Sequence, residues 1–107
     1  MINPAKIRSF CDAVAKQFRP RKIILFGSHA YGQPTTDSDV DLLVIMPRSH
    51  QRGERMWVRI RHAVPRDFSL DLLVRTPLEV ARSLRHEDFF IRDIMENGKI
   101  MYKTHNN

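Results

Sequence analysis

The sequence predicts an α/β sandwich (α+β) in which a small mixed sheet is backed by helices, with carboxylates at one end of the sheet. Two observations predict this architecture. Short runs rich in β-branched and aromatic residues alternate with segments whose apolar residues recur at helical spacing. The length of 107 residues suits one domain with one modest core. We therefore expect residues 1–107 to form a single domain in the order helix, strand, loop, strand, helix, strand, helix, helix and final short strand.

Clear start and stop signals frame the first helix. Asn3 can cap it, Pro4 suits the first helical position, and Pro20 stops the segment. Its apolar face is predicted by residues at helical spacing: Ile7, Phe10, Cys11, Val14 and Phe18. The β-branched and aromatic run at 22–26 then predicts a short buried strand.

The middle of the chain predicts two more strands joined by a helix. Turn-forming residues are concentrated at 29–38, and the apolar run at 40–46 predicts the second strand. After Gly53, apolar residues at helical spacing predict a helix: Met56, Trp57, Ile60 and Val64. The segment 68–74 predicts the third strand.

The C-terminal part predicts two helices and a final short strand. Thr76 to Glu79 has the form of a capping box with proline at the first helical position, so a helix begins there. A last helix is expected around 88–96, and Gly98 ends it.

A turn of small residues follows the first strand. Gly27 has no Cβ, so the backbone can turn sharply there and approach a ligand closely. Ser28 adds a hydroxyl and a backbone N–H, both of which can donate to a phosphate oxygen. The pair alone is a weak signal, but its place at the end of a buried strand favours phosphate binding.

Two acids interrupt the beginning of the second apolar run. Asp39 and Asp41 are two residues apart, so on a strand they project to one face, with Cα atoms roughly 6.6 Å apart. Such acids at the mouth of an apolar strand are costly unless a cation neutralises them. Mg²⁺ is the natural partner, because it commonly binds one or two carboxylates together with substrate phosphates.

A third acid repeats the pattern. Asp71 begins the apolar part of the third strand and would lie within ~5 Å of the first pair if the two strands were neighbours. Asp67 is a nearby rival, but it follows Pro65 and Arg66 in a predicted loop. Three carboxylates suit a two-metal site, and their combination with the Gly-Ser turn predicts a nucleotidyl-transfer enzyme.

The segment from Gly27 to Asp41 (Gly-Ser-x10-Asp-x-Asp) resembles the defining motif of the polymerase-β-type nucleotidyltransferase superfamily. The short chain, the stretch 38–44 and the ending 97–102 resemble its minimal nucleotidyltransferase branch. The resemblance covers roughly residues 7–102 and implies the polymerase-β-like nucleotidyltransferase fold. Members of this branch commonly act as the antitoxin of a small helical HEPN-type ribonuclease toxin. The resemblance implies transfer of AMP from ATP to a tyrosine hydroxyl of that toxin, which silences it.

The resemblance also implies a role for each residue of the motif. The Gly-Ser turn would hold the triphosphate of ATP, and Asp39 and Asp41 would bind Mg²⁺. Asp71 matches the third acid, which helps to hold the second metal ion and activates the acceptor hydroxyl. The chain departs from the pattern at Tyr31, where many relatives carry an arginine, so one phosphate contact is in doubt.

Composition constrains the partners and the compartment. Larger members of the superfamily bring helical domains that form much of the substrate cleft, and this chain has no room for one. A partner protein is therefore expected to complete the site. The single cysteine, Cys11, excludes an internal disulfide, fits a reducing cytoplasm and belongs to the apolar face of the first helix. No apolar run approaches ~18 residues, so no membrane span is predicted, and the expected location is cytoplasmic.

Arginines are concentrated between the second and third strands, in a chain of formal net charge +6. They are Arg48, Arg52, Arg55, Arg59, Arg61 and Arg66. They could contact ATP phosphates, an RNA strand or an acidic partner, or form an ordinary solvated helix face. No aromatic interleaving supports stacking on single-stranded nucleic acid. Docking of a partner protein is the preferred role, and direct nucleic-acid binding is not expected.

The remaining histidines and aromatic residues predict no further site. The five histidines are scattered, without the spacing of a zinc cluster, and His29 is expected to be a surface-loop residue. Trp57 and the pair Phe89-Phe90 are expected to belong to the core or to an interface.

Two alternatives from other functional classes remain open. One is an antitoxin that keeps the fold and neutralises a toxin by binding alone. The other is a small basic RNA-binding module, whose affinity would fall steeply with salt and would not depend on ATP or Mg²⁺. Transfer to a small molecule such as an aminoglycoside is disfavoured, because so short a chain offers little pocket.

Overall fold

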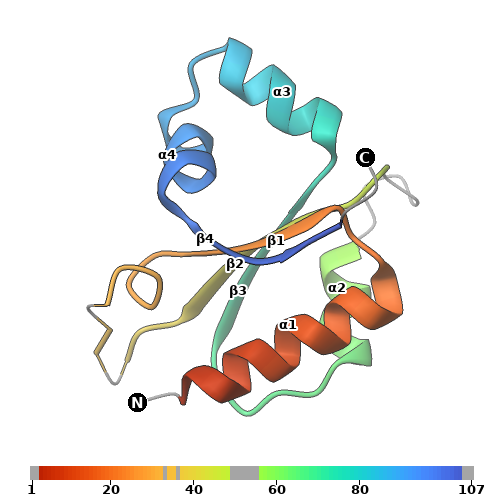
Figure 1. Ribbon diagram of the computed structural model, residues 1–107, viewed down its shortest axis with the longest axis vertical. Helices are drawn as coiled ribbons and strands as arrows, with labels where there is room; N and C mark the ends of the chain where they lie inside the picture. Colours follow the sequence, from red (N-terminus) through yellow and green to blue (C-terminus); the bar gives the residue numbers. More distant parts are fainter. Residues whose placement is uncertain (1–2, 33, 36, 49–55, 105–107) are drawn as a thin grey trace.

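A four-stranded mixed sheet lies between two pairs of helices in the computed structural model, which describes residues 3–32, 34–35, 37–48 and 56–104 (Figure 1). The first two helices cover one face of the sheet, and the last two cover the other. The α/β architecture predicted from the sequence is confirmed, as is the order of its elements. No helix in the described ranges is both long enough and apolar enough to cross a membrane.

The helices and strands begin and end close to the predicted boundaries. In chain order they are α1 (Pro4–Phe18), β1 (Lys22–Phe26), β2 (Val40–Ile45), α2 (Met56–Ala63), β3 (Leu70–Arg75), α3 (Pro77–Arg85), α4 (Phe89–Asn97) and β4 (Lys99–Lys103). The predicted start of the second helix after Gly53 falls at residues 49–55, outside the described part of the chain.

The sheet topology brings three strand ends together. The strand order is β3-β2-β1-β4, and β2 and β3 are parallel, whereas the other neighbours are antiparallel. The end of β1 and the starts of β2 and β3 therefore lie at the same end of the sheet. In this register Asp41 pairs with Phe26 of β1 and with Asp71 of β3. The prediction that the two acid-bearing strands are neighbours in the sheet is confirmed.

Both faces of β2 are covered, which explains its continuous apolar run. Successive strand side chains point to opposite faces. Leu42 and Val44 pack in the cluster that includes α1 and α2, whereas Leu43 and Ile45 pack in the cluster that includes α3 and α4. By the same alternation Asp41 lies on the face of Leu43, so its carboxylate is on the side of the sheet that α3 and α4 cover.

Side-chain caps hold the predicted helix starts. The Asn3 side chain accepts a hydrogen bond of 2.9 Å from the Ala5 backbone N–H at the start of α1. Thr76 and Glu79 form the predicted reciprocal capping box at α3, with distances of 3.1 and 2.8 Å. Both start signals read from the sequence are therefore confirmed.

Gly98 follows α4 because of close packing rather than a left-handed cap. Its φ of −68° is accessible to any residue. A Cβ at this position would collide with Ile24 Cγ2 of β1 and with the Ile94 carbonyl oxygen. We therefore expect Gly98→Ala to lower the free energy of unfolding by about 1–3 kcal/mol, because α4 must move away from β1. Urea denaturation measures this loss, and an unchanged midpoint would show that the helix end adapts freely.

Two residues of the predicted apolar faces differ in their burial. Cys11 is fully buried in α1, and burial raises the pKa of its thiol to about 12, so it is a core thiol as expected. Trp57 is 47% exposed, so of the two expected places, core or interface, the core is excluded. It lies about 100° around α2 from Met56, at the edge of the apolar stripe, and its large ring extends beyond the buried strip.

Candidate active site

The candidate site lies where β1 ends and where β2 and β3 begin. Asp41 and Asp71 face each other in register on neighbouring parallel strands, which lie about 4.8 Å apart in such sheets. Asp39 comes just before β2, and the pairing continues there, because the Val40 N–H donates to the Ser69 carbonyl oxygen at 2.9 Å. The structure thus brings the three predicted acids to one end of the sheet.

Gly27 is required next to these acids for two reasons. Its φ of +74° lies in the left-handed region, which side chains disfavour. In addition, a Cβ at this position would collide with Asp41 Oδ2. The sequence predicted a glycine that admits a ligand, and the structure shows that the vacated space is bordered by a carboxylate of the protein itself. The turn and the acid are therefore packed as one unit.

The backbone after Gly27 folds into a tight turn that contains Ser28. The N–H groups of Ala30 and Tyr31 both donate to the Gly27 carbonyl oxygen, at 3.0 and 3.3 Å. Ser28 is half-buried within this turn, directly after β1. The predicted phosphate-binding pair is thus held beside Asp41 by local hydrogen bonds.

His29 connects the two ends of the loop between β1 and β2. Its Nε2 donates to the Ser38 carbonyl oxygen at 3.2 Å, which places a proton on that nitrogen. The residue is half-buried and close enough to Asp41 for its charge to favour the ionised carboxylate. His29 is a loop residue, as expected, and in addition its hydrogen bond links the two ends of the loop.

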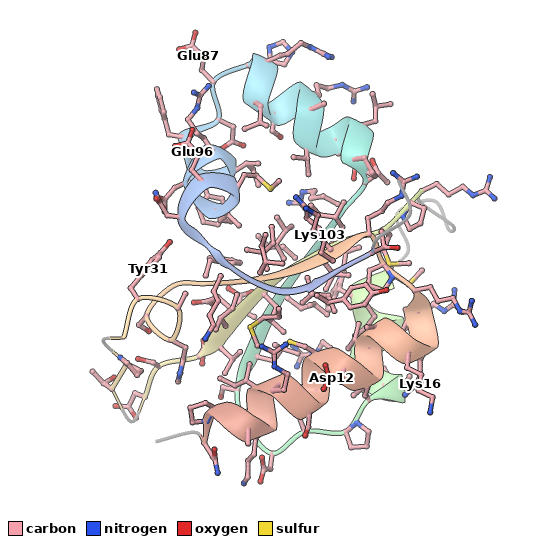
Figure 2. All side chains as sticks on the ribbon, in the orientation of Figure 1. Asp12, Lys16, Tyr31, Glu87, Glu96 and Lys103 are labelled. Carbon is pink, nitrogen blue, oxygen red and sulfur yellow. The ribbon has the colours of Figure 1, made fainter. Side chains whose placement is uncertain are left out.

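Tyr31 is directed towards α4. Figure 2 shows its side chain extending from the loop in that direction, and its hydroxyl donates to Asp93 Oδ2 at 3.3 Å. Desolvation, followed by the charge of Asp93 and this hydrogen bond, raises the pKa of the Tyr31 hydroxyl. The residue that departs from the family pattern thus attaches the loop to a helix.

The three acids share one electrostatic environment. Burial raises the pKa of Asp41, and the negative charges of Asp71 and Asp39 raise it further, while His29 opposes them. Asp39 and Asp71 themselves are exposed. A divalent cation would relieve this repulsion, so the donor set fits Mg²⁺.

The carboxylates do not form a closed metal cage by themselves. Within the described ranges, no three Asp, Glu, His or Cys side chains lie close enough together to hold a metal ion. Mg²⁺ does not require such a cage, because it commonly takes one or two carboxylates and completes its shell with water and substrate phosphates. Asp41 with one neighbouring acid suits that mode of binding.

Mg²⁺ is expected to raise the melting temperature near neutral pH and to have less effect in acid. The folded-state pKa of Asp41 lies above the ordinary value of 3.8. Its contribution to stability is therefore present below that value and is lost as the pH rises through the folded-state pKa, where the carboxylate becomes charged. Calorimetry with and without Mg²⁺ at about pH 4 and about pH 7 tests this, since bound cation offsets the repulsion only when the acids are ionised.

The control for this measurement is Asp12→Asn, which removes an exposed acid on α1. It should keep the whole Mg²⁺ effect. An equal shift in melting temperature at both pH values would contradict cation binding by Asp41 and its neighbours.

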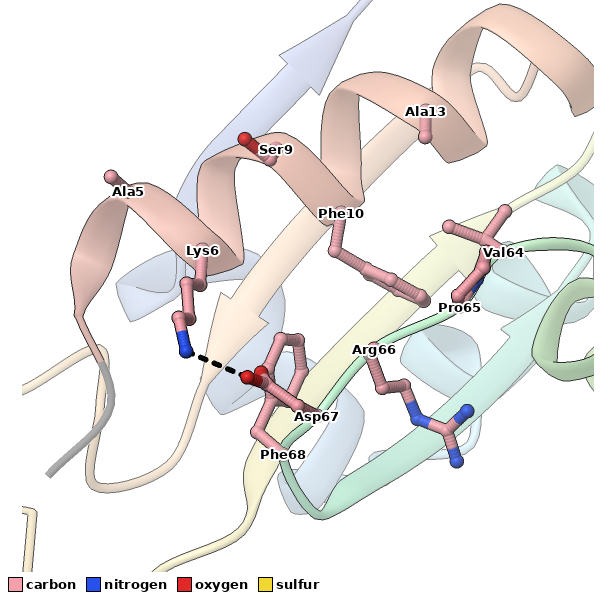
Figure 3. Close-up of a pocket in the computed structure, with 10 residues that line it drawn as sticks. All are labelled: Ala5, Lys6, Ser9, Phe10, Ala13, Val64, Pro65, Arg66, Asp67 and Phe68. Atoms are coloured by element: carbon pink, nitrogen blue, oxygen red, sulfur yellow. Dashed lines mark hydrogen bonds and ion pairs between the residues drawn. The ribbon is translucent and has the colours of Figure 1, made fainter.

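Asp67 has a partner of its own. It forms an ion pair of 2.7 Å with Lys6 of α1, and this contact lowers the pKa of its carboxyl group (Figure 3). Asp71, by contrast, is paired in register with Asp41. The structure therefore supports Asp71 rather than Asp67 as the third acid.

An aromatic residue that the sequence did not assign to the site borders it. The Phe90 ring of α4 packs edge-on against Phe26, with centroids 5.7 Å apart, and Phe26 is paired with Asp41. Phe90 is 55% exposed and Phe89 is 72% exposed, so of the two expected places, core or interface, the core is excluded. The sequence offered no local signal that Phe90 borders the site, because its contact with Phe26 depends on how α4 packs on β1.

A Gly-Ser turn beside carboxylates on neighbouring strands of a mixed sheet defines a nucleotidyltransferase. Residues 7–101 match the family model described as "Nucleotidyltransferase domain". The chain belongs to this family, and the enzyme class predicted from the motif is confirmed.

Two individual proteins are similar to this chain. A "putative protein adenylyltransferase" of Methanocaldococcus jannaschii is 28% identical over 106 residues, which span 90% of this chain and 94% of that protein. The crystal structure of a "putative nucleotidyltransferase" from Sulfolobus solfataricus superimposes with a TM-score of 0.62 at 17% identity. That match covers 96% of this chain and 82% of the other, and it establishes the similarity of the fold.

Proposed function

We propose that this nucleotidyltransferase transfers AMP from ATP, in a Mg²⁺-dependent reaction, to a tyrosine hydroxyl of a cognate HEPN-type toxin, and so acts as its antitoxin. The observation that carries the reaction type is the in-register pairing of Asp41 with Asp71 beside the Gly27 turn. The name of the Methanocaldococcus jannaschii relative supports a protein acceptor. The antitoxin role and the toxin partner rest on the resemblance of residues 38–44 and 97–102 to the minimal branch.

The reaction exchanges one phosphorus–oxygen bond for another. The tyrosine oxygen bonds to the α-phosphorus of ATP, while the bond from that phosphorus to the bridging oxygen breaks. Pyrophosphate leaves with the electron pair, opposite the attacking oxygen, and Asp71 accepts the hydroxyl proton. Mg²⁺, held by Asp39, Asp41 and Asp71, would supply positive charge where negative charge develops.

The residues around the acids bind and orient the triphosphate. The Ser28 hydroxyl and backbone N–H donate to its oxygens, and the tight turn at Gly27 keeps these donors beside Asp41. His29 holds the loop to the start of β2 through Ser38, so the distance between turn and acids is fixed before ATP binds. Preorganised donors of this kind stabilise the transition state without reorganisation.

The exposed aromatic pair supports a protein acceptor. Phe89 and Phe90 present apolar surface at the edge of the site, where a protein carrying the tyrosine can cover them. Aromatic residues are enriched in the central parts of protein interfaces. The same surface would also serve an antitoxin that binds without chemistry.

The decisive experiment incubates the protein with labelled ATP, Mg²⁺ and the helical product of the neighbouring gene. Mass analysis should find AMP on a tyrosine of that neighbour, and the modified neighbour should lose ribonuclease activity. Asp39→Asn should abolish labelling, whereas Asp37→Asn, which removes an exposed acid of the same loop, should not.

Other outcomes separate the alternatives. A toxin that is neutralised equally well by Asp39→Asn would identify an antitoxin that acts by binding alone. RNA binding that falls steeply with salt and ignores ATP and Mg²⁺ would identify a nucleic-acid module. Labelling that persists in both Asp39→Asn and Asp41→Asn would refute the assignment of the metal ligands.

A further inference from the structure

A polar depression adjoins the candidate site on the side of β3. It has a volume of about 500 Å³, and its lining residues include Asp39, Arg61, Arg66 and Ser69. Asp39 is therefore shared between this depression and the group of acids. Apart from Asp39, its lining comes from α2, the loop before β3 and the start of β3, so the depression adjoins the site on the side of the sheet that α1 and α2 cover.

Arg66 contributes an unusual buried group. Its Nε is buried and has no hydrogen-bond partner among the described residues. Figure 3 shows its guanidinium group pointing away from the Lys6–Asp67 ion pair. Buried donors are nearly always satisfied, so an unsatisfied one indicates a ligand or water that completes it. An arginine can offer an oxyanion two parallel N–H donors.

Arg61 is fixed at the same place. One of its terminal nitrogens donates to the Leu70 carbonyl oxygen of β3 at 3.0 Å. This bond holds the guanidinium group against the strand, and no other hydrogen bond of that group is made within the described residues. Both arginines thus line the depression: the Arg61 guanidinium group is anchored to β3, and the buried Nε of Arg66 has no partner among the described residues.

The acids that line the depression do not neutralise the two arginines when Mg²⁺ is bound. Asp67 is already paired with Lys6. Asp39, in the function proposed above, binds Mg²⁺. Arg61 and Arg66 then line the depression without an unpaired carboxylate among its lining residues, which suits an anionic group of a ligand.

The in-line geometry of the displacement indicates which substrate supplies this anion. In the sheet order, β1 and β3 lie on opposite sides of β2. The triphosphate belongs to the Gly27 turn at the end of β1, so pyrophosphate leaves on that side. In-line displacement requires the attacking hydroxyl to approach from the opposite side. β3 lies on that side of β2, and both arginines line the depression next to its start.

We infer that Arg61 and Arg66 bind an acidic side chain of the acceptor protein, close in space to the tyrosine that receives AMP. This inference rests on the proposed function and names the class of acceptor: a tyrosine with a neighbouring aspartate or glutamate. The ion pair holds the acceptor chain along β3, so the hydroxyl reaches Asp71 from the side opposite the Gly27 turn.

The test uses fluorescent peptides that carry one tyrosine and a single nearby glutamate, paired with peptides in which glutamine replaces the glutamate. With the full chain, Mg²⁺ and a non-hydrolysable ATP analogue, the glutamate peptides should bind about tenfold more tightly, the effect of one charge-assisted hydrogen bond. Arg66→Gln should abolish this preference. Arg59→Gln is the matched control, because it removes one positive charge from α2 outside the depression and should leave the preference intact.

A charge reversal and an ATP measurement complete the test. Arg66→Glu should shift the preference to peptides with lysine in place of glutamate, and its melting temperature shows whether it folds. The affinity for the ATP analogue should be the same in all variants. If Arg66→Gln instead weakens ATP binding about tenfold, the arginines bind the triphosphate and the inference is wrong.

The remaining outcomes distinguish this inference from the proposed function. Equal binding of glutamate and glutamine peptides would overturn the acidic subsite, even if the neighbouring gene product receives AMP. Binding of a short RNA through Arg66, with no binding of either peptide, would also overturn it. A glutamate preference in binding without AMP transfer to any protein would support the subsite and refute the proposed transferase activity.

Discussion

Asp41→Asn is expected to reduce AMP transfer by at least about 10³-fold, because it removes the most central carboxylate of the metal-binding group, and a bound metal contributes several kcal/mol to transition-state stabilisation. Asp41 is paired with Asp71 in register and lies directly against the Gly27 turn. An asparagine has the same shape but cannot neutralise Mg²⁺. Single-turnover transfer of labelled AMP to the acceptor protein measures the loss.

The fold should tolerate this substitution. Burial and, after it, the charges of Asp71 and Asp39 raise the pKa of Asp41, and both costs of a charged carboxylate disappear in the asparagine variant, so the melting temperature near neutral pH should stay the same or rise. Loss of activity with a lower melting temperature would point to misfolding rather than to chemistry. Retention of activity would show that Asp39 and Asp71 suffice, which contradicts the assigned role of Asp41.

Gly27→Ala should lower activity by about 10²-fold, the usual cost of a displacement of about 1 Å in a reacting group. The new Cβ would collide with Asp41 Oδ2, so either the carboxylate or the turn must move. The φ of +74° adds a conformational cost of about 1 kcal/mol or more. Steady-state transfer rates together with urea denaturation separate the two effects.

Gly32→Ala provides the matched control. Gly32 has nearly the same φ, +77°, but a Cβ there meets no atom within 4 Å. It should therefore lose a similar amount of conformational stability while keeping most of its activity. If both alanine variants lose activity equally, backbone strain in the loop, rather than the contact with Asp41, is responsible.

Local patterns were sufficient to predict the elements and the acids. Period-two alternation places Asp39 and Asp41 on one face, and a helix between two strands favours the parallel pairing that brings Asp71 beside Asp41. The caps at Asn3 and Thr76 are local hydrogen bonds, so the residue types at these positions predict them. These features depend on spacing within short segments, which a single sequence records.

Features that depend on tertiary packing could not be predicted in the same way. The contact of His29 with Ser38 requires the closed loop, and that of Phe90 with Phe26 requires α4 to lie over β1. The buried nitrogen of Arg66 follows from how the loop before β3 packs, whereas the sequence shows only one arginine among several. Gly27 was recognised as special, but its contact with Asp41 depends on the register of two strands.

The hydrogen bond between Tyr31 and Asp93 has a thermodynamic consequence. It joins the loop that follows β1 to α4, the helix that presents Phe89 and Phe90 to solvent. If ATP strengthens or breaks this bond, it changes the free energy of α4 in its present position. Linkage then requires a protein bound to α4 to change the affinity for ATP by the same factor. Nucleotide and partner protein would therefore cooperate, or compete, through a single exposed phenol.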